Sequence, residues 1–374
     1  EATATIKSAF SSANGDWVAE KVEPIQSGVD VERHNLPVLP NEFWDARPVF
    51  THIRTAAWSR NRSGDVALHV VLARLSAMVS HRLRLDTGVG DLTVPLNYYA
   101  AIVGESGGGK SSSKAVADRL MPPPSEFYFD MRDDQPLGSG EGLAESFYGT
   151  VSEPPIDGKG KPIQKRTVVR NNAFFFCDEG QVMERLQSRN GATLGPQLRS
   201  AWTGSALGQA NASEDRYRYV PAGSYSLGLI IGFQFNTVQP LLDDVDGGTP
   251  QRFAYVAAAD PSIPDEAPAW PGTIQLKHET LWPNSDEVFD IDPRIRQEIR
   301  TTDTGRNRGV IKYDPLDSQA PLMRIKIAAL LALLDDRHNV TLEDWGLASD
   351  ILTTSAGVRT ALVVWGSQRR AQEQ

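Results

Sequence analysis

The chain has 374 residues, of which 40% are apolar and 23% charged, and its 38 basic and 47 acidic residues give a formal net charge of −9. At the usual prior of roughly 100–200 residues per domain this is two or three domains, and the composition excludes a disulfide-stapled mini-protein, a collagen-like chain and a mainly disordered chain. An acidic chain has no global positive field for nucleic acid, so any contact with DNA or RNA must be local.

The single cysteine excludes an intramolecular disulfide and cysteine-cluster zinc sites, and it fits a reducing cytoplasm, which is the location we expect. The longest apolar runs, at 227–233 and 327–334, are shorter than the roughly 18 residues of a membrane span, so no membrane partner is expected. The chain begins with Glu1 rather than Met, and we expect it to be a fragment of a longer chain.

Four segments are expected along the chain. Residues 1–42 are polar and punctuated by prolines, which indicates an extended arm or linker. Residues 43–95 are expected to form a helical lead-in, because apolar residues recur there at helical spacing. Residues 96–260 alternate strand and helix patterns around a glycine-rich loop, which predicts an α/β core with a parallel sheet. Residues 261–374 begin as a proline-rich acidic linker and continue as a mainly helical C-terminal domain.

Individual elements follow from the same patterns. The run at 173–177 is markedly apolar, as in a buried parallel strand, and Thr341 and Asp344 have capping-box spacing at the start of the last helix. Strands are expected at 98–103, 126–131, 168–177, 226–233 and 253–258, and helices within 43–85 and at 111–120, 142–147, 316–334 and 341–365.

A glycine-rich motif follows the first strand of the core. The residues Gly104-Glu-Ser-Gly-Gly-Gly-Lys110-Ser111 fit G-x-x-x-x-G-K-[ST] between an apolar strand and a helix, which is the context that the motif requires. Backbone N–H groups of such a loop surround nucleotide phosphates, Lys110 adds a point charge, and Ser111 ligates Mg²⁺. The predicted cofactors are therefore ATP and Mg²⁺. The predicted binding residues are Gly104, Ser106, Gly107, Gly108, Gly109, Lys110, Ser111 and Ser112.

Two acidic residues, Asp178 and Glu179, follow the most apolar strand. In a nucleotide hydrolase the first acid holds Mg²⁺ through water and the second polarises the attacking water, so both must lie at the carboxyl-terminal edge of the sheet beside the phosphate loop. An apolar run that ends in acids is also a common strand end. Its position after a phosphate loop favours the functional interpretation. The histidines are scattered, so no metal site besides nucleotide-bound Mg²⁺ is predicted.

Two more residues are candidates for ATP hydrolysis. Gln234 directly follows the strand at 226–233, where its amide can hydrogen-bond the γ-phosphate or the attacking water; a plain polar strand end is nearly as good an interpretation. Arg252 follows Gly247-Gly248, and an arginine on such a loop can stabilise the transferring phosphoryl group of a neighbouring subunit. A surface salt bridge explains this arginine equally well.

Two stretches predict contacts with nucleic acid. The first is a turn at 157–162 with basic residues around it, which is typical of a hairpin with a basic tip. The second alternates arginine with tyrosine at 215–219, so a strand there has cations on one face and rings on the other. Either stretch can also be an ordinary exposed hairpin. The candidate contacts are Lys159, Lys161, Arg216 and Arg218.

The order of the motifs resembles one group of proteins, the helicase-like P-loop ATPases of phages and integrated plasmids, of AAA+ or RecA type, which are often fused behind primase-polymerase domains. The resemblance covers roughly residue 43 to the C-terminus, where the last helices resemble the lid of hexameric replicative helicases. The motifs are Pro95-Leu96-Asn97-Tyr98, Val103-Gly104, Lys110-Ser111, Gly138-Ser139-Gly140-Glu141-Gly142-Leu143, Cys177-Asp178-Glu179, Ala201-Trp202-Thr203-Gly204, Gly232-Phe233-Gln234 and Gln251-Arg252-Phe253.

This resemblance implies an α/β P-loop NTPase core with a helical lead-in and a helical C-terminal domain. It also implies an ATP-hydrolysing ring motor, usually a hexamer, that translocates on or unwinds single-stranded or forked DNA during replication of a mobile genetic element, with a fused or associated primase. Sensor residues of AAA+ helicases are more often Asn, so Asn236 can replace Gln234 and the choice between AAA+ and RecA-like affiliation is open. By position, Lys110 and Ser111 would bind phosphate and Mg²⁺, Asp178 and Glu179 would be the acidic pair, Gln234 the sensor and Arg252 the trans-acting arginine.

A second hypothesis is an ATPase that remodels protein partners or acts as a nucleotide switch, without DNA as its track. The acidic net charge and the polar N-terminal segment favour it modestly. A small-molecule kinase fits less well, because a kinase has no use for paired acids followed by an arginine loop and a long helical domain.

Overall fold

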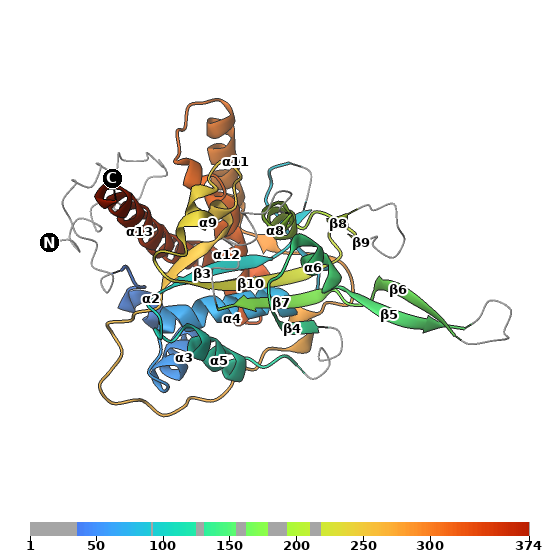
Figure 1. Cartoon of the computed structure of the whole chain (residues 1–374), viewed down its shortest axis with the longest axis horizontal. Helices are drawn as coiled ribbons and strands as arrows, with labels where there is room; N and C mark the ends of the chain where they lie inside the picture. The colour runs from blue at the N-terminus through green and yellow to red at the C-terminus, as the bar shows by residue number, and fades with distance from the viewer. Residues whose placement is uncertain are drawn as a thin grey trace.

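The computed structural model describes residues 36–90, 93–124, 131–154, 162–178, 193–209 and 218–373. Its centre is a five-stranded parallel sheet with the strand order β11-β3-β10-β7-β4 (Figure 1). The expected α/β class with a parallel sheet is therefore confirmed. The strands are β3 (Tyr98–Val103), β4 (Met131–Gln135), β7 (Asn172–Cys177), β10 (Ser226–Phe233) and β11 (Ala254–Ala257).

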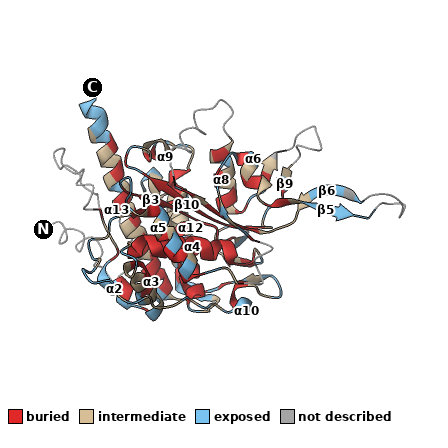
Figure 2. Ribbon diagram, turned by 60° about the horizontal axis from the view of Figure 1, so that its bottom comes forward, coloured by how far each residue is buried: buried red, intermediate tan, exposed pale blue. Residues whose placement is uncertain are grey.

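Strands β3 and β10 begin and end at the residues predicted from their apolar runs. Every residue of both strands is buried, which explains why these runs are continuous rather than alternating. Helix α4 (Gly64–Met78) is also buried along its whole length and packs against β3, β7 and β10 (Figure 2). The helical lead-in thus forms part of the core of the sheet domain.

The lead-in contains α2 (Asn41–Asp45), α3 (Pro48–Trp58) and α4. The helical pattern expected through residue 85 is wrong at its end, where β1 (Leu83–Asp86) is a strand between β2 (Thr93–Val94) and β12 (Glu287–Val288). The β1–β12 pairing joins residues 204 positions apart, so tertiary context overrides the local apolar spacing here.

Two other strands differ from their expected bounds. β4 begins at Met131, and the rest of the stretch expected there, 126–130, lies outside the described residues. The strand expected at 168–177 begins at Asn172, because Val168 ends a separate strand, β6 (Ile163–Val168). The side chain of Asn172 donates hydrogen bonds to backbone carbonyls at the end of α4 and just after it, which fixes where β7 starts.

Two antiparallel hairpins extend from the same end of the molecule (Figure 1). One pairs β5 (Tyr148–Glu153) with β6, and the other pairs β8 (Leu207–Gln209) with β9 (Arg218–Val220). Helix α6 (Gly140–Glu145) packs against β8 and β9, and α8 (Leu194–Thr203) lies beside it. The tips of both hairpins lie outside the described residues.

The remaining elements connect the sheet to the C-terminal helices. Segment 261–274 contacts both α3 and α5 (Lys110–Leu120), since His52 hydrogen-bonds Gly272 and the Ile274 N–H donates to the Leu120 carbonyl. One continuous buried apolar cluster runs from Leu36 to Leu362. The elements are α5 (Lys110–Leu120), α9 (Gln239–Asp243), η3 (Pro250–Arg252), α10 (His278–Leu281), β13 (Asp290–Ile291), α11 (Pro293–Asn307), η4 (Pro315–Asp317), α12 (Ala320–Leu334), β14 (Asn339–Val340) and α13 (Leu342–Gln372).

Helix α13 begins at the capping box that the sequence predicted. The Thr341 hydroxyl accepts from the Asp344 N–H, and the Asp344 carboxylate accepts from the Thr341 N–H. By length and composition alone α13 could cross a membrane, with a mean hydropathy of 1.2 over 18 residues, but the core helix of a globular domain meets the same criterion. Here α13 packs against α12 and β11.

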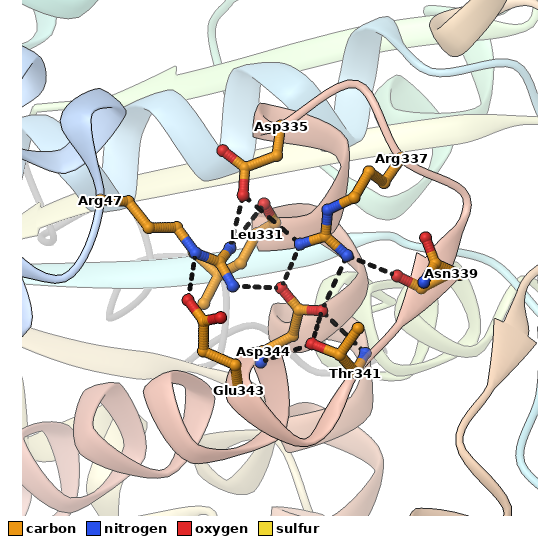
Figure 3. A network of polar contacts seen from close by, with 8 residues as sticks. All are labelled: Arg47, Leu331, Asp335, Arg337, Asn339, Thr341, Glu343 and Asp344. Carbon is orange, nitrogen blue, oxygen red and sulfur yellow. Dashed lines mark hydrogen bonds and ion pairs between the residues drawn. The ribbon is translucent and has the colours of Figure 1, made fainter.

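A buried network of charges joins the lead-in to the turn between α12 and α13 (Figure 3). The Arg47 guanidinium pairs with Asp344 at 2.7 Å, Glu343 at 2.9 Å and Asp335 at 3.0 Å. Arg337 pairs with Asp344 from the other side at 2.8 Å. We call this group the Arg47–Asp344 network; it connects segments that are about 300 residues apart in the chain.

Candidate nucleotide-binding site

The predicted phosphate loop connects the end of β3 to the start of α5. Gly107 and Gly109 have φ angles of +76° and +83°, a left-handed conformation that glycine adopts without steric cost. At Gly104, a Cβ would lie 2.5 Å from the Ala258 Cβ. Helix α5 has no side-chain cap, so the N–H groups of its first turn have neither a capping side chain nor an intrahelical partner. This arrangement is suited to binding phosphate.

Lys110 lies within this loop and is 8% exposed. Its ammonium group donates to the carbonyl oxygens of Gly104 at 3.3 Å and Glu105 at 2.9 Å. Neutral carbonyls satisfy hydrogen bonds without cancelling the charge. The ammonium therefore remains available as a counter-charge for an anion bound by the loop.

Ser111 and Asp178 meet at the same edge of the sheet. The Ser111 hydroxyl donates a hydrogen bond to the Asp178 carboxylate, although β10 lies between β3 and β7. A hydroxyl and an exposed carboxylate supply the hard oxygen ligands that Mg²⁺ prefers, so the pair fits this ion. Glu179 lies outside the described residues. Among the described residues, no group of three His, Cys, Asp or Glu side chains could hold a metal ion.

Gly232 explains how Lys110 and Asp178 approach each other across β10. A Cβ at this position would lie 3.0 Å from the Asp178 carbonyl oxygen and 3.2 Å from the Lys110 Cδ. Sequence reasoning missed Gly232 as a site residue. The signal was available, because a glycine inside an otherwise bulky buried strand marks a close approach by another part of the chain.

Gln234 and Asn236 are both exposed just beyond β10. The Phe233 carbonyl accepts from the Gly104 N–H at 3.1 Å, so Gln234 follows directly beside the start of the phosphate loop. The Gln234 N–H donates to the Thr237 hydroxyl at 2.9 Å, which fixes the backbone of this turn. Either amide remains a candidate sensor.

Arg252 lies at the end of the sheet where the parallel strands begin, whereas the phosphate loop lies where they end. β11 runs parallel to β3 in the register Ala254–Ala100, so η3 precedes the sheet on the side where β3 begins. The six residues of β3 separate this edge from the loop by about 20 Å, at roughly 3.3 Å per residue. Arg252 therefore cannot reach the phosphate loop of its own chain.

The Arg252 guanidinium is turned toward its own domain. It donates to the Gly248 carbonyl and lies over the Trp202 ring with its Cζ 5.5 Å from the ring centroid. Burial lowers the pKa of Arg252 below its usual value, and the charge of Arg199 lowers it further. An approaching anion would relieve both costs.

Arg62 contacts the phosphate loop from the turn between α3 and α4. Its Nε donates to the Ser112 hydroxyl, and its Cδ lies 3.0 Å from where a Gly109 Cβ would be. Sequence reasoning did not find this residue. No local motif marks an arginine that reaches the loop from nearly 50 residues upstream.

The hairpins meet at the end of α6. Glu145 forms ion pairs with Arg166 of β6 and Arg218 of β9. The Tyr148 hydroxyl accepts from the Tyr219 N–H at 2.8 Å and donates to the Tyr219 carbonyl at 3.0 Å. Of the candidate nucleic-acid contacts, Arg218 is thus engaged within the protein, and Lys159, Lys161 and Arg216 lie outside the described residues.

Comparison with known proteins adds little to this geometry. No protein-family model matches the sequence, and no curated protein matches it. One similar solved structure is that of a full-length MCM homolog from Methanopyrus kandleri, with a TM-score of 0.43 and 12% sequence identity. The match covers 85% of this chain and 62% of that one. A similarity of this size does not establish a shared function.

Proposed function

We propose that this chain hydrolyses ATP with Mg²⁺ at the phosphate loop. The observation that carries the proposal is the meeting of Lys110, Ser111 and Asp178 at the carboxyl-terminal edge of the sheet. Lys110 and the first-turn amides of α5 bind the phosphates, while Ser111 and Asp178 hold the ion. The bound ion neutralises charge that develops on the phosphates. Glu179 and Gln234 are the proposed residues that orient the attacking water.

The proposed assembly is a ring, usually a hexamer. Its support is the separation of Arg252 from its own phosphate loop by the length of β3. If Arg252 stabilises the transferring phosphoryl group, the arginine must come from a neighbouring copy. In a head-to-tail arrangement, Arg252 of one copy faces the phosphate loop of the next copy. Such an arrangement forms a ring when the rotation between copies closes.

The proposed track is single-stranded or forked DNA. Two hairpins extend from one end of an acidic molecule, and both contain arginines; a basic tip is predicted for the first and an arginine–tyrosine alternation for the second. Replication of a mobile genetic element, with a fused or associated primase, is proposed from the resemblance of the motif order. The second candidate is an ATPase that remodels proteins, which the net charge of −9 favours.

Steady-state ATP hydrolysis, measured with and without single-stranded DNA, duplex DNA and RNA, separates the two candidates. We expect single strands to stimulate turnover, more strongly at low salt than at moderate salt because phosphate contacts are salt-sensitive. Hydrolysis that is indifferent to all three nucleic acids would favour the remodelling ATPase. Lys110→Ala is the control for contaminating activity.

Mixing two inactive variants tests the neighbouring-copy role of Arg252. Arg252→Ala keeps an intact phosphate loop, whereas Lys110→Ala keeps the arginine. A mixed ring then contains interfaces that carry both groups, and we expect the mixture to regain part of the activity that each variant lacks. Wild-type turnover by Arg252→Ala alone would remove the arginine from the mechanism.

A further inference from the structure

We propose that Arg62 binds the nucleotide at its α-phosphate end, so that the helical lead-in completes the nucleotide site. The inference deepens the proposed ATPase function and rests on it. It assigns a role to a residue outside the motifs, in the turn between α3 and α4. The contacts of Arg62 with Gly109 and Ser112 carry the argument.

Two positive features meet where Arg62 lies. The first is the N-terminus of α5, which carries the positive end of the helix dipole. The second is the guanidinium itself, which contacts this terminus at Gly109 and Ser112. Among the described residues no carboxylate pairs with Arg62, which donates instead to the Ser112 hydroxyl and, at 2.7 Å, to the Asn61 carbonyl. Like charges gathered without a counter-ion are unfavourable, and a bound anion removes that cost.

The geometry of α5 indicates which part of the nucleotide Arg62 contacts. Successive residues of a helix are about 100° apart around its axis, so the side chains of Ser111 and Ser112 leave the helix in different directions. Ser111 points to Asp178 and thus marks the metal and terminal-phosphate end of the site. Ser112 points to Arg62. Arg62 therefore lies toward the phosphate nearest the nucleoside, which ATP and ADP share.

Binding of ADP and of a non-hydrolysable ATP analogue, each measured by calorimetry with Mg²⁺, tests this placement. We expect Arg62→Ala to raise the Kd of both nucleotides by about 10-fold or more, since a charge-assisted hydrogen bond to phosphate is lost. Arg62→Lys should restore part of the affinity, because it keeps the charge without the planar guanidinium. Arg60→Ala is the matched control: it removes the same charge from the same turn at an exposed position.

The other outcomes of this experiment distinguish the role of Arg62 from the proposed ATPase function. If wild-type protein binds both nucleotides and Arg62→Ala binds them like Arg60→Ala, the inference is overturned and the proposed function stands. Loss of affinity for the ATP analogue alone moves Arg62 to the terminal phosphate and overturns the placement. Failure of the wild-type protein to bind either nucleotide overturns both proposals. Melting curves without nucleotide report folding, and Arg62→Gln, which keeps an N–H donor but removes the charge, carries the test if Arg62→Ala does not fold.

Discussion

The phosphate-loop edge and the Arg47–Asp344 network are both clusters of an acid, a hydroxyl and a cation, yet they differ in saturation. Asp344 is fully buried and accepts from Arg47, Arg337 and Thr341. Asp178 is exposed, and among the described residues its carboxylate accepts from Ser111 alone. A saturated cluster has no capacity for a ligand and can only hold the fold, whereas an open cluster keeps lone pairs for one.

Removing Asp344 is the strongest test of the Arg47–Asp344 network. Burial raises the pKa of Asp344, but hydrogen bonds from Arg337, Thr341 and Arg47 outweigh it and hold the pKa below its usual range. Asp344→Ala leaves two guanidinium groups without their shared acceptor. We expect a loss of about 3–5 kcal/mol in the free energy of unfolding, measured by urea denaturation.

The control is Arg294→Ala, which breaks an exposed ion pair with Asp292 and should lower the free energy of unfolding far less than Asp344→Ala does, because water screens the pair. A loss of similar size in both variants would mean that the buried network contributes no more than a surface pair. Nucleotide affinity should stay unchanged in Asp344→Ala wherever the protein is folded.

Removing Lys110 tests the cluster at the phosphate loop. Lys110→Ala should reduce ATP turnover by about 100–1000-fold, since the ammonium is a preorganised counter-charge for phosphate. Its stability should change far less than its turnover, because the lost partners are two neutral loop carbonyls rather than a paired charge. Lys114→Ala, one turn further along α5, is the matched control and should keep wild-type turnover. A Lys110→Ala protein that loses stability but keeps turnover would reverse the comparison.

The sequence predicts the parts of these two clusters that depend on neighbouring residues, and it does not predict the contacts between distant segments. The loop at 104–111 was predicted from its glycine motif, and Gly107 and Gly109 of that motif have the left-handed backbone that restricts the residue type locally. The capping box was predicted as well, since Thr341 and Asp344 are three residues apart. The pairing of Arg47 with Asp344 was not, because it joins segments that only the folded chain brings together.

The same limit explains the other misses. The contact of Arg62 with Ser112 and the pairing of β1 with β12 depend on distant partners, and no periodicity encodes them. The strand bounds of β3 and β10 were recovered because both strands are buried on all sides and read as unbroken apolar runs. Glu179 and the four candidate nucleic-acid contacts stay predictions.

Asp65 is a buried carboxylate that accepts fewer hydrogen bonds than Asp344, so it shows the effect of burial alone. It is buried like Asp344, but its carboxylate accepts from the Leu39 N–H at 2.8 Å and not from a guanidinium, and burial raises its pKa to about 7. The folded-state pKa thus lies above the unfolded value of 3.8, so Asp65 stabilises the fold fully below pH 3.8 and loses this contribution as the pH rises to about 7. The loss is about 1.4 kcal/mol per pH unit.

Asp65→Asn keeps an acceptor for Leu39 and removes the titration. Its stability relative to wild type should therefore rise by about 2–3 kcal/mol between pH 5 and pH 7, as measured by urea denaturation at each pH. The comparison with wild type cancels the titration of all other groups. A difference that stays flat over this range would contradict the raised pKa, and burial without saturation would then carry no penalty at this site.

Glu145 is the converse case, an acid that is exposed yet pairs with both Arg166 and Arg218. Glu145→Gln should change the free energy of unfolding by less than about 1 kcal/mol, because water screens both pairs. If the hairpins contact DNA, the freed guanidinium groups should bind phosphates, so affinity for single-stranded DNA rises and its salt dependence steepens by about one unit of slope. Glu266→Gln makes the same change in net charge in the proline-rich segment, and it should leave both quantities unaltered. An equal gain in the two variants would trace the effect to net charge and leave the hairpins without a role. A gain confined to Glu145→Gln would mean that DNA phosphates compete with Glu145 for Arg166 and Arg218. The arginines that pair with buried Asp344 are closed to such competition.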